Sequence, residues 1–136
     1  MADYKGLYMR YMDQNNIKYT DVDERVVKVV YSGDNLQSII VYVFFDPDGE
    51  NLVTFRSWDI ANFKESQVPA GIRVCNDLNK QYRWVKFFIA DDGDITAQID
   101  AVVDEMTCGE ECAHLVRRVV SIVDQSYPDI MKTLWS

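Results

Sequence analysis

Cysteine and histidine are scarce in this chain of 136 residues, which contains three cysteines and one histidine. Cys75, Cys108 and Cys112 are odd in number, and their spacing matches neither a disulfide framework nor the C-x-x-C pairs of zinc sites. We therefore expect reduced thiols and no metal or other cofactor. His114 stands two positions from Cys112, and side chains two apart on a helix do not face each other, so no Cys-His nucleophilic pair is predicted.

Long apolar segments and basic clusters are also absent. The longest apolar run, Ile39–Phe45, is far shorter than a membrane span, and charges interrupt the N-terminal segment MADYKGLYMRYMDQNN, unlike a signal peptide. Acidic residues number 22 against 14 basic ones, and no run of five Lys or Arg occurs. The resulting net charge of −8 repels phosphate backbones and anionic lipids, so we expect a cytoplasmic protein with no nucleic-acid and no membrane partner.

The six glycines form no P-loop, no G-x-G-x-x-G and no G-x-S-x-G motif. Two acidic turns, at residues 46–49 and 91–94, begin like calcium loops. The twelfth position from Asp46 is Ser57, however, and the twelfth from Asp91 is Val102, where a calcium loop needs glutamate. No pair of carboxylates stands out either, and we predict no catalytic residues and no enzymatic activity.

The remaining composition is that of one globular domain. Apolar residues make up 48% of the chain and charged residues 26%, and aromatic side chains are plentiful. No repeat, linker or low-complexity segment divides the sequence. We therefore expect a single domain over residues 1–136.

Apolar periodicity predicts three helices and five strands. The expected helices cover residues 4–12, residues 69–82 and a segment after Thr107, which with Glu110 would form a capping box. Tyr127 and Pro128 are expected to interrupt this last helix before a short tail helix. The expected strands are 26–31, 39–45, 52–55, 85–89 and 95–101. The order α-β-β-β-α-β-β-α predicts an α+β fold with an antiparallel five-stranded sheet.

In the second helix we expect Ile72, Cys75, Leu78, Asn79 and Tyr82 to share the inner face. Since Asn is a poor helix former, either Asn76 or Asn79 should turn toward the protein and bind strand or loop backbone. Contact with a ligand is the alternative for this pair.

Two strand features predict register and partners. A three-residue loop with Gly93 in the left-handed region would place Ile89 opposite Ile95 and Val85 opposite Ile99, keeping apolar residues on one face. The strand Ile39–Phe45 has no polar face, which is typical of a strand covered on both sides. Helices can cover one of these faces, and the other needs more helices or a second chain, which suggests a dimer or partner surface.

The second half of the chain resembles the YbjN-like family. The resemblance rests on Val74-Cys75-Asn76-Asp77-Leu78-Asn79, on Trp84-Val85-Lys86-Phe87 before an acidic turn, and on a last helix ending Asp124-Gln125-Ser126-Tyr127-Pro128. It covers roughly residues 72–134. The resemblance implies a fold like that of type III secretion chaperones and a role in regulating bacterial sensory transduction. It supplies no catalytic residues, only the motif positions Asn76 and Asn79.

Together these features predict a non-enzymatic protein-binding module, a regulator of bacterial signalling or a chaperone-like peptide binder. We expect a homodimer and a protein or peptide partner. The candidate interface is the exposed side of the second helix and the strand with Trp84, Lys86 and Phe88. Two alternatives stay open at this point. One is a small-molecule or metal-binding domain or an unrecognised enzyme, and the other is an acidic inhibitor or immunity-type protein with a basic partner.

Overall fold

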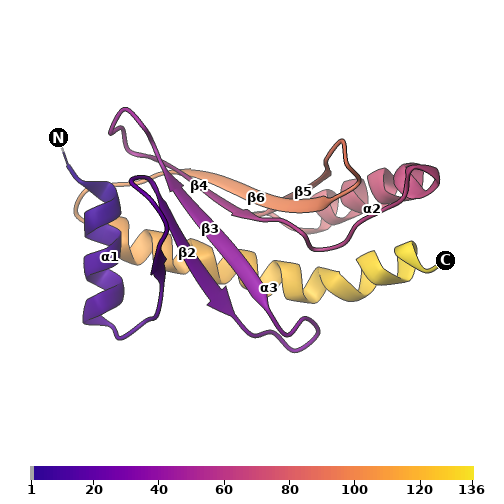
Figure 1. Cartoon of the computed structure of the whole chain (residues 1–136), viewed down its shortest axis with the longest axis horizontal. Helices are drawn as coiled ribbons and strands as arrows, with labels where there is room; N and C mark the ends of the chain where they lie inside the picture. Colours follow the sequence, from indigo (N-terminus) through magenta and orange to yellow (C-terminus); the bar gives the residue numbers. More distant parts are fainter. Residues whose placement is uncertain (1) are drawn as a thin grey trace.

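One antiparallel sheet, with helices on one face and at its ends, makes up the chain (Figure 1). The computed structural model describes residues 2–136. The elements, in chain order, are α1 (Tyr4–Gln14), β1 (Thr20–Asp21), β2 (Val26–Tyr31), β3 (Ile39–Phe45), β4 (Leu52–Ser57), η1 (Glu65–Gln67), α2 (Val68–Gln81), β5 (Lys86–Ile89), β6 (Ile95–Val102) and α3 (Cys108–Leu134). The predicted α+β class is confirmed, and so is the order of the three helices and five longer strands.

The sheet has six strands in the order β1-β2-β3-β4-β6-β5. The sixth strand is the two-residue β1, where Thr20 lies opposite Lys28 and Asp21 opposite Val27. The five-stranded prediction missed it because two residues are too short to show an alternating pattern. The two edge positions of the sheet are therefore held by its two shortest strands, β1 and β5.

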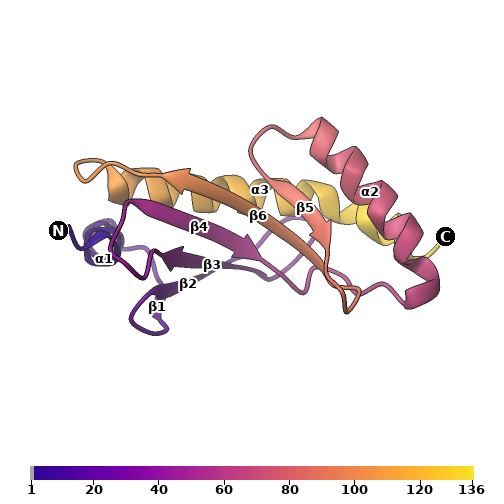
Figure 2. The same cartoon turned by 90° about the horizontal axis from the view of Figure 1, so that it is seen from above.

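The core lies between the inner face of the sheet and the helices. Val41 and Val43 of β3 are fully buried, as is Phe55 of β4. Helix α3 runs along this face (Figure 2), and α1 packs against its N-terminal part, where the Tyr8 ring lies 6.0 Å from the ring of Phe45. Every second residue of the central strands thus supplies the core.

No helix of the described part of the chain lies on the outer face of the sheet (Figures 1 and 2). On β3 the residues alternate between buried and half-buried, and Ile40, Tyr42 and Phe44 are the half-buried set. Helices thus cover one face of β3, as expected, and no helix of the described residues covers the other face, for which the sequence predicted more helices or a second chain. The strand is apolar on both faces, but only one of them is packed.

The β5–β6 hairpin has the predicted register. Ile89 lies opposite Ile95 and Phe87 opposite Ala97. Gly93, with a φ of 87°, closes the three-residue loop in the left-handed region that glycine tolerates. The ladder ends at Lys86, however, so the expected pairing of Val85 with Ile99 is not part of it. Strand β5 is shorter than the alternating pattern suggested.

Helix α2 begins at Val68, with proline in its first turn as predicted. Its buried face is rotated from the expected one, since Gly71 and Val74 are buried and Ile72 is 54% exposed. A Cβ on Gly71 would lie 2.9 Å from the Ile89 side chain and 3.1 Å from the Phe63 ring. Close packing at a glycine therefore turns Ile72 outward, a preference that apolar periodicity does not reveal.

Helix α3 continues through Pro128 without interruption, so the predicted break at Tyr127 and Pro128 is wrong. Proline lacks the N–H that would bind the carbonyl of Asp124, four residues earlier. The side chain of Asn35 supplies the missing donor, with its Nδ2 3.1 Å from that carbonyl oxygen. A contact from a distant loop thus satisfies the group that Pro128 leaves free.

The start of α3 differs from the predicted capping box. Thr107 is the N-cap residue as expected, but its side chain makes no capping hydrogen bond. Its hydroxyl donates instead to the carboxylate of Glu111, and the backbone N–H of Asp104 also donates to that group. Glu111 therefore organises this turn in place of Glu110. None of the helices in the described residues is long and apolar enough to cross a membrane.

Candidate functional site

The outer face of the sheet is left without a covering helix by the residues that the structure describes. Register places every second residue of each strand on it. The residues are Val26, Lys28 and Val30 of β2; Ile40, Tyr42 and Phe44 of β3; Leu52, Thr54 and Arg56 of β4; Gln98, Asp100 and Val102 of β6; and Lys86 and Phe88 of β5. We call this set, together with Trp58, the outer face.

Three aromatic side chains form the centre of the outer face. The rings of Tyr42 and Trp58 stack in parallel, with centroids 4.3 Å apart and an interplanar angle of 2°. Phe44 lies 6.1 Å from Trp58 and 6.4 Å from Tyr42. Offset and tilted arrangements of this kind are favourable for aromatic pairs. The cluster is thus an ordered, half-buried apolar platform.

Arg56 adds one cation to this platform. Its guanidinium carbon lies 5.5 Å from the centroid of the Phe44 ring, and its Nε donates a hydrogen bond to Gln98 Oε1 at 2.8 Å. A guanidinium over an aromatic ring is attracted to the π-face. The cation is therefore fixed in the middle of the sheet rather than free in solvent.

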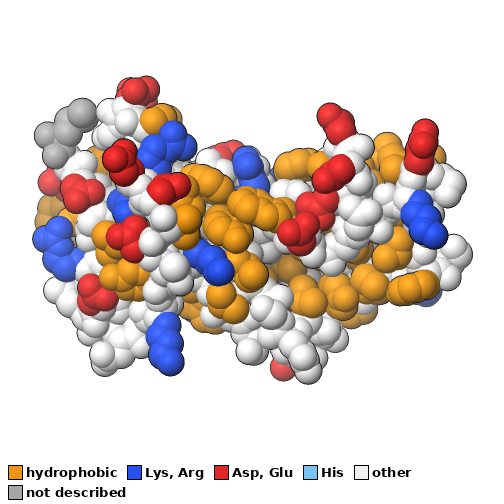
Figure 3. All heavy atoms as spheres, viewed as in Figure 1, with side chains coloured by type: hydrophobic (Ala, Val, Ile, Leu, Met, Phe, Trp, Pro, Cys, Tyr) orange, Lys and Arg blue, Asp and Glu red, His pale blue; other side chains and the backbone are white. Residues whose placement is uncertain are grey.

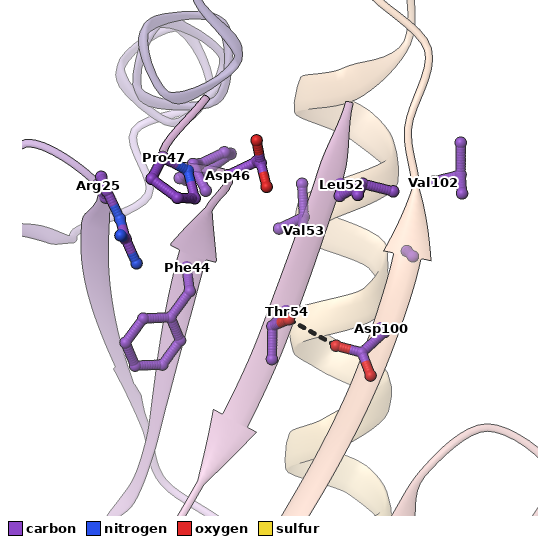
Figure 4. Close-up of a pocket in the computed structure, with 11 residues that line it drawn as sticks. Arg25, Phe44, Asp46, Pro47, Leu52, Val53, Thr54, Asp100 and Val102 are labelled. Carbon is purple, nitrogen blue, oxygen red and sulfur yellow. Dashed lines mark hydrogen bonds between the residues drawn. The ribbon is translucent and has the colours of Figure 1, made fainter. Parts of the chain in front are cut away.

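A hollow of about 400 Å³ lies at one end of the outer face, beside the turn at Asp46 and Pro47 (Figure 4). Strands β3, β4 and β6 line it, together with Arg25 at the start of β2. Across it the hydroxyl of Thr54 donates to the carboxylate of Asp100, which is a cross-strand contact. The hollow offers apolar walls and a few polar groups, an arrangement suited to binding.

The space-filling view shows how this face meets solvent. Hydrophobic side chains gather across its middle, with acidic and basic side chains around them (Figure 3). Val30 is 53% exposed, Phe88 44% and Val102 68%. Exposed apolar side chains gathered on one face and rimmed by charges are typical of a protein-binding surface.

The three predicted interface residues lie at one end of the outer face. Trp84, Lys86 and Phe88 line one shallow depression together with residues of β6. The ammonium group of Lys86 donates to the backbone carbonyls of Asn79 and Tyr82, at 3.0 and 2.9 Å. Lys86 therefore satisfies carbonyls at the end of α2, while Trp84 and Phe88 supply exposed apolar area.

The two predicted asparagines occupy different environments. The Asn79 side chain accepts a hydrogen bond from the backbone N–H of Phe87 at 2.6 Å and donates one to the Phe87 carbonyl at 2.9 Å. It thereby connects α2 to β5. Asn76 is exposed and makes no side-chain hydrogen bond within the described residues. The structure thus places only one of the pair in contact with another element.

The thiols and the histidine are not gathered into a site. All three cysteines are buried and free, and only Cys108 and Cys112 approach each other, at 3.9 Å between sulfurs. Burial raises the pKa of Cys75 to about 11, and the contact with Cys108 together with burial raises that of Cys112. His114 is exposed and accepts a hydrogen bond from Arg118. Within residues 2–136 no three side chains of the metal-binding types come together.

Two carboxyl groups with shifted pKa values lie away from the aromatic cluster. Burial raises the pKa of Asp94 despite hydrogen bonds from the Asp59 backbone and the Thr96 hydroxyl. At Asp124 partial desolvation acts to raise the pKa, but backbone N–H groups of the β2–β3 loop lower it overall. Both groups hold loops in place.

Sequence reasoning missed the aromatic cluster and Arg56. The alternation of Ile40, Tyr42 and Phe44 on β3 was the available signal, because it shows that the second face of this strand is apolar too. Trp58 lies beyond the end of β4, and no pattern in the sequence indicates that it folds back onto Tyr42.

Comparison with known proteins gave one family and a similar solved structure. The family model YbjN, described as "Putative bacterial sensory transduction regulator", matches residues 9–131. The chain is similar to the crystal structure of YbjN, a putative transcription regulator from E. coli, with a TM-score of 0.67 and 13% identity. That match covers 93% of this chain and 92% of the other, and at this identity it shows the fold alone. The comparison with curated proteins gave no match.

Proposed function

The chain belongs to the YbjN family of bacterial regulators, and from this premise we propose that it is a non-enzymatic, cytoplasmic regulator that acts by binding another protein. The observation that supports the proposal is the outer face, an ordered apolar surface that no helix of this chain covers. A net charge of −8 favours a protein partner over nucleic acid or anionic membrane.

The partner is proposed to cover the aromatic cluster and the apolar residues around it. Trp, Tyr and Arg dominate the binding energy of protein interfaces, and Trp58, Tyr42 and Arg56 lie together at the centre of this face. Val30 and Phe88 extend the apolar surface on either side along the sheet. A partner would thus bury rigid rings that lose little side-chain entropy on binding.

Capture of partners from extracts of the source bacterium tests this proposal. We expect the double variant V30K/F88K to lose proteins that the wild type retains, because two charges would enter the apolar surface. The matched control is Val22→Lys, since Val22 is 47% exposed but lies outside the outer face. Identical sets of captured proteins for wild type and V30K/F88K, quantified by mass spectrometry, would refute the proposal.

A homodimer is a second part of the proposal, with the exposed side of α2 as its surface. Ile72 on that side is 54% exposed. Light scattering over a wide concentration range, at two salt concentrations, measures the mass directly. We expect a dimer that Ile72→Lys weakens, and a strict monomer would remove this part while leaving the partner-binding role in place.

A further inference from the structure

Residues 99–102 of β6 have a neighbouring strand on one side only. Strand β4 pairs with β6 as far as Val102, whereas β5 pairs with it only as far as Gln98. Strand β5 begins at Lys86, and its ladder with β6 begins there too, so residues before Lys86 are not part of that ladder. The far side of residues 99–102 is therefore an unpaired strand edge next to the centre of the sheet.

The backbone groups that face this edge follow from the hydrogen bonds at the two ends of β6. The N–H groups of Ile95 and Val103 donate to the carbonyls of Ala61 and Asn51, both on the β4 side. Since successive residues of an antiparallel strand direct their backbone groups to alternate sides, Asp100 and Val102 point theirs away from β4. Two N–H donors and two carbonyl acceptors thus face the open edge.

On the neighbouring edge strand, β5, the outward backbone groups of Phe87 are hydrogen-bonded to a side chain of α2. Phe87 of β5 would expose its backbone N–H and carbonyl, but the side chain of Asn79 binds both. Native proteins block exposed strand edges because these pair readily with other chains. The chain therefore occupies the outward backbone groups of Phe87 on β5, whereas those of Asp100 and Val102 on β6 have no strand beside them within the described residues.

A hollow of about 500 Å³ lies beside the open edge, between β6 and α3. Trp84, Ile99 and Leu115 form apolar walls, and Val102 at the edge is 68% exposed. A strand added here would direct every second side chain toward α3 and into this hollow.

The carboxylates that line the hollow form no ion pair within the described residues. Asp100 and Glu111 line it, and their hydrogen bonds come from neutral donors, the hydroxyls of Thr54 and Thr107 among them. The ion pairs within the described residues, Lys5–Asp21 and Lys80–Asp77, lie elsewhere.

Arg118 and Lys86 lie beside Trp84, which lines the hollow, and both are already engaged. The guanidinium of Arg118 lies over the Trp84 ring and donates to His114, while Lys86 binds carbonyls of α2. The site thus presents carboxylates that no cation within residues 2–136 pairs with, which favours a basic ligand.

We propose that the edge of β6 at Asp100 and Val102 binds an extended segment of a partner protein as an added strand, with apolar side chains toward α3 and basic side chains beside Asp100. This rests on the proposed function, because the segment belongs to the partner of the outer face. Main-chain hydrogen bonds hold such strands, and pockets for alternate side chains select them. Pairing with β6 of a second copy in the register that places Asp100 opposite Asp100 is disfavoured, since it would bring two carboxylates together.

The probe is a fluorescein-labelled peptide of alternating lysine and valine, measured by anisotropy with the full-length protein. We expect it to bind, and a peptide of alternating glutamate and valine to bind at least about tenfold more weakly. N-methylation of the residues whose N–H faces β6 should weaken binding by about tenfold or more, because hydrogen bonds are lost. N-methylation of the alternate residues should leave binding unchanged.

Two substitutions at one position test the edge on the protein side. Val102→Pro removes a backbone N–H that points away from β4 and has no strand beside it within residues 2–136, and Val102→Thr keeps it. We expect the proline variant to lose the peptide and the threonine variant to bind it like the wild type, with matching thermal melts for all three proteins.

Equal binding by V102P and the wild type, or equal effects of the two N-methylation patterns, would overturn the proposal. The proposal would also be overturned by a wild-type dimer that the V102P substitution dissociates and the peptide does not dissociate. The edge of β6 would then hold a second copy of the chain. The proposed function fails separately, when V30K/F88K captures the same proteins as the wild type. If the V102P variant retains the partners and V30K/F88K loses them, the protein binds its partners through the outer face and not through the edge of β6.

Discussion

Asp124 and Pro128 are four residues apart on α3, and both contribute to the contacts between this helix and the β2–β3 loop. Pro128 frees the Asp124 carbonyl, which accepts the Asn35 side chain, while the Asp124 carboxylate accepts the backbone N–H groups of Asp34, Asn35 and Leu36 at 2.8–3.0 Å. A Cβ on Gly33 would lie 2.2 Å from that carboxylate. We call these contacts the Asp124 latch, since they hold the β2–β3 loop against α3.

Replacing Asp124 with Asn tests the latch through its pH dependence. Three backbone N–H groups lower the pKa of Asp124 in the folded state, more than desolvation raises it. A lowered folded pKa means that the charged carboxylate stabilises the protein above the unfolded value of about 3.9, and that this contribution is lost as pH falls through the folded pKa. We expect D124N to be less stable at pH 7 by about 1–2 kcal/mol.

The difference between wild type and D124N should shrink below about pH 4, where the carboxyl becomes protonated. Urea unfolding at several pH values measures it, and subtracting the two curves removes the opposite contribution of Asp94, whose pKa is raised. A difference that stays constant down to pH 3 would mean that the charge of Asp124 plays no part.

At the scale of elements, the contact between α2 and β5 depends on one side chain. Asn79 binds both backbone groups of Phe87, and the exposed Asn76 on the same helix is its natural control. We expect Asn79→Ala to cost about 1–3 kcal/mol in unfolding free energy, because it leaves two partly buried groups unpaired.

Asn76→Ala should change stability by less than about 0.5 kcal/mol, as is usual for exposed positions. Denaturant unfolding of the two variants at one pH provides the comparison. Equal losses for both would show that Asn79 stabilises the helix itself rather than its contact with the strand.

Elements with a clear local pattern were predictable from the sequence. The bounds of β3 and the register of the β5–β6 hairpin follow from alternation and from Gly93, because both signals lie within a few residues. The uninterrupted α3 did not follow, since the donor that replaces the N–H of Pro128 comes from a loop some 90 residues away. The outer face was foreseen only in part, as a second apolar face of β3.

At the scale of the whole molecule, α3 links the two ends of an elongated shape (Figure 1). It packs against α1 near one end, against α2 near the other and against the sheet between them. The buried side chains form one continuous cluster. We therefore expect a single cooperative unfolding transition rather than two.

The buried thiols allow unfolding to be followed separately at the two ends of the molecule. Cys75 lies on α2 and Cys112 near the start of α3, beside α1. Both are buried and have raised pKa values, so they should react with a thiol reagent only when the protein opens. Pulse labelling across a urea gradient, read by mass spectrometry, should give the same midpoint for both. Separate midpoints would show that one end opens on its own.

The Asp124 latch also bears on the order of events during synthesis. The loop that it holds leaves the ribosome about 90 residues before Asp124 does, a delay of roughly 5–20 s at ordinary translation rates. During that interval the β2–β3 hairpin is complete in sequence, but α3, the helix that runs along the inner face of the sheet, has not yet been made. The nascent chain thus spends seconds with an apolar hairpin exposed, and α3, the last element made, ends that exposure.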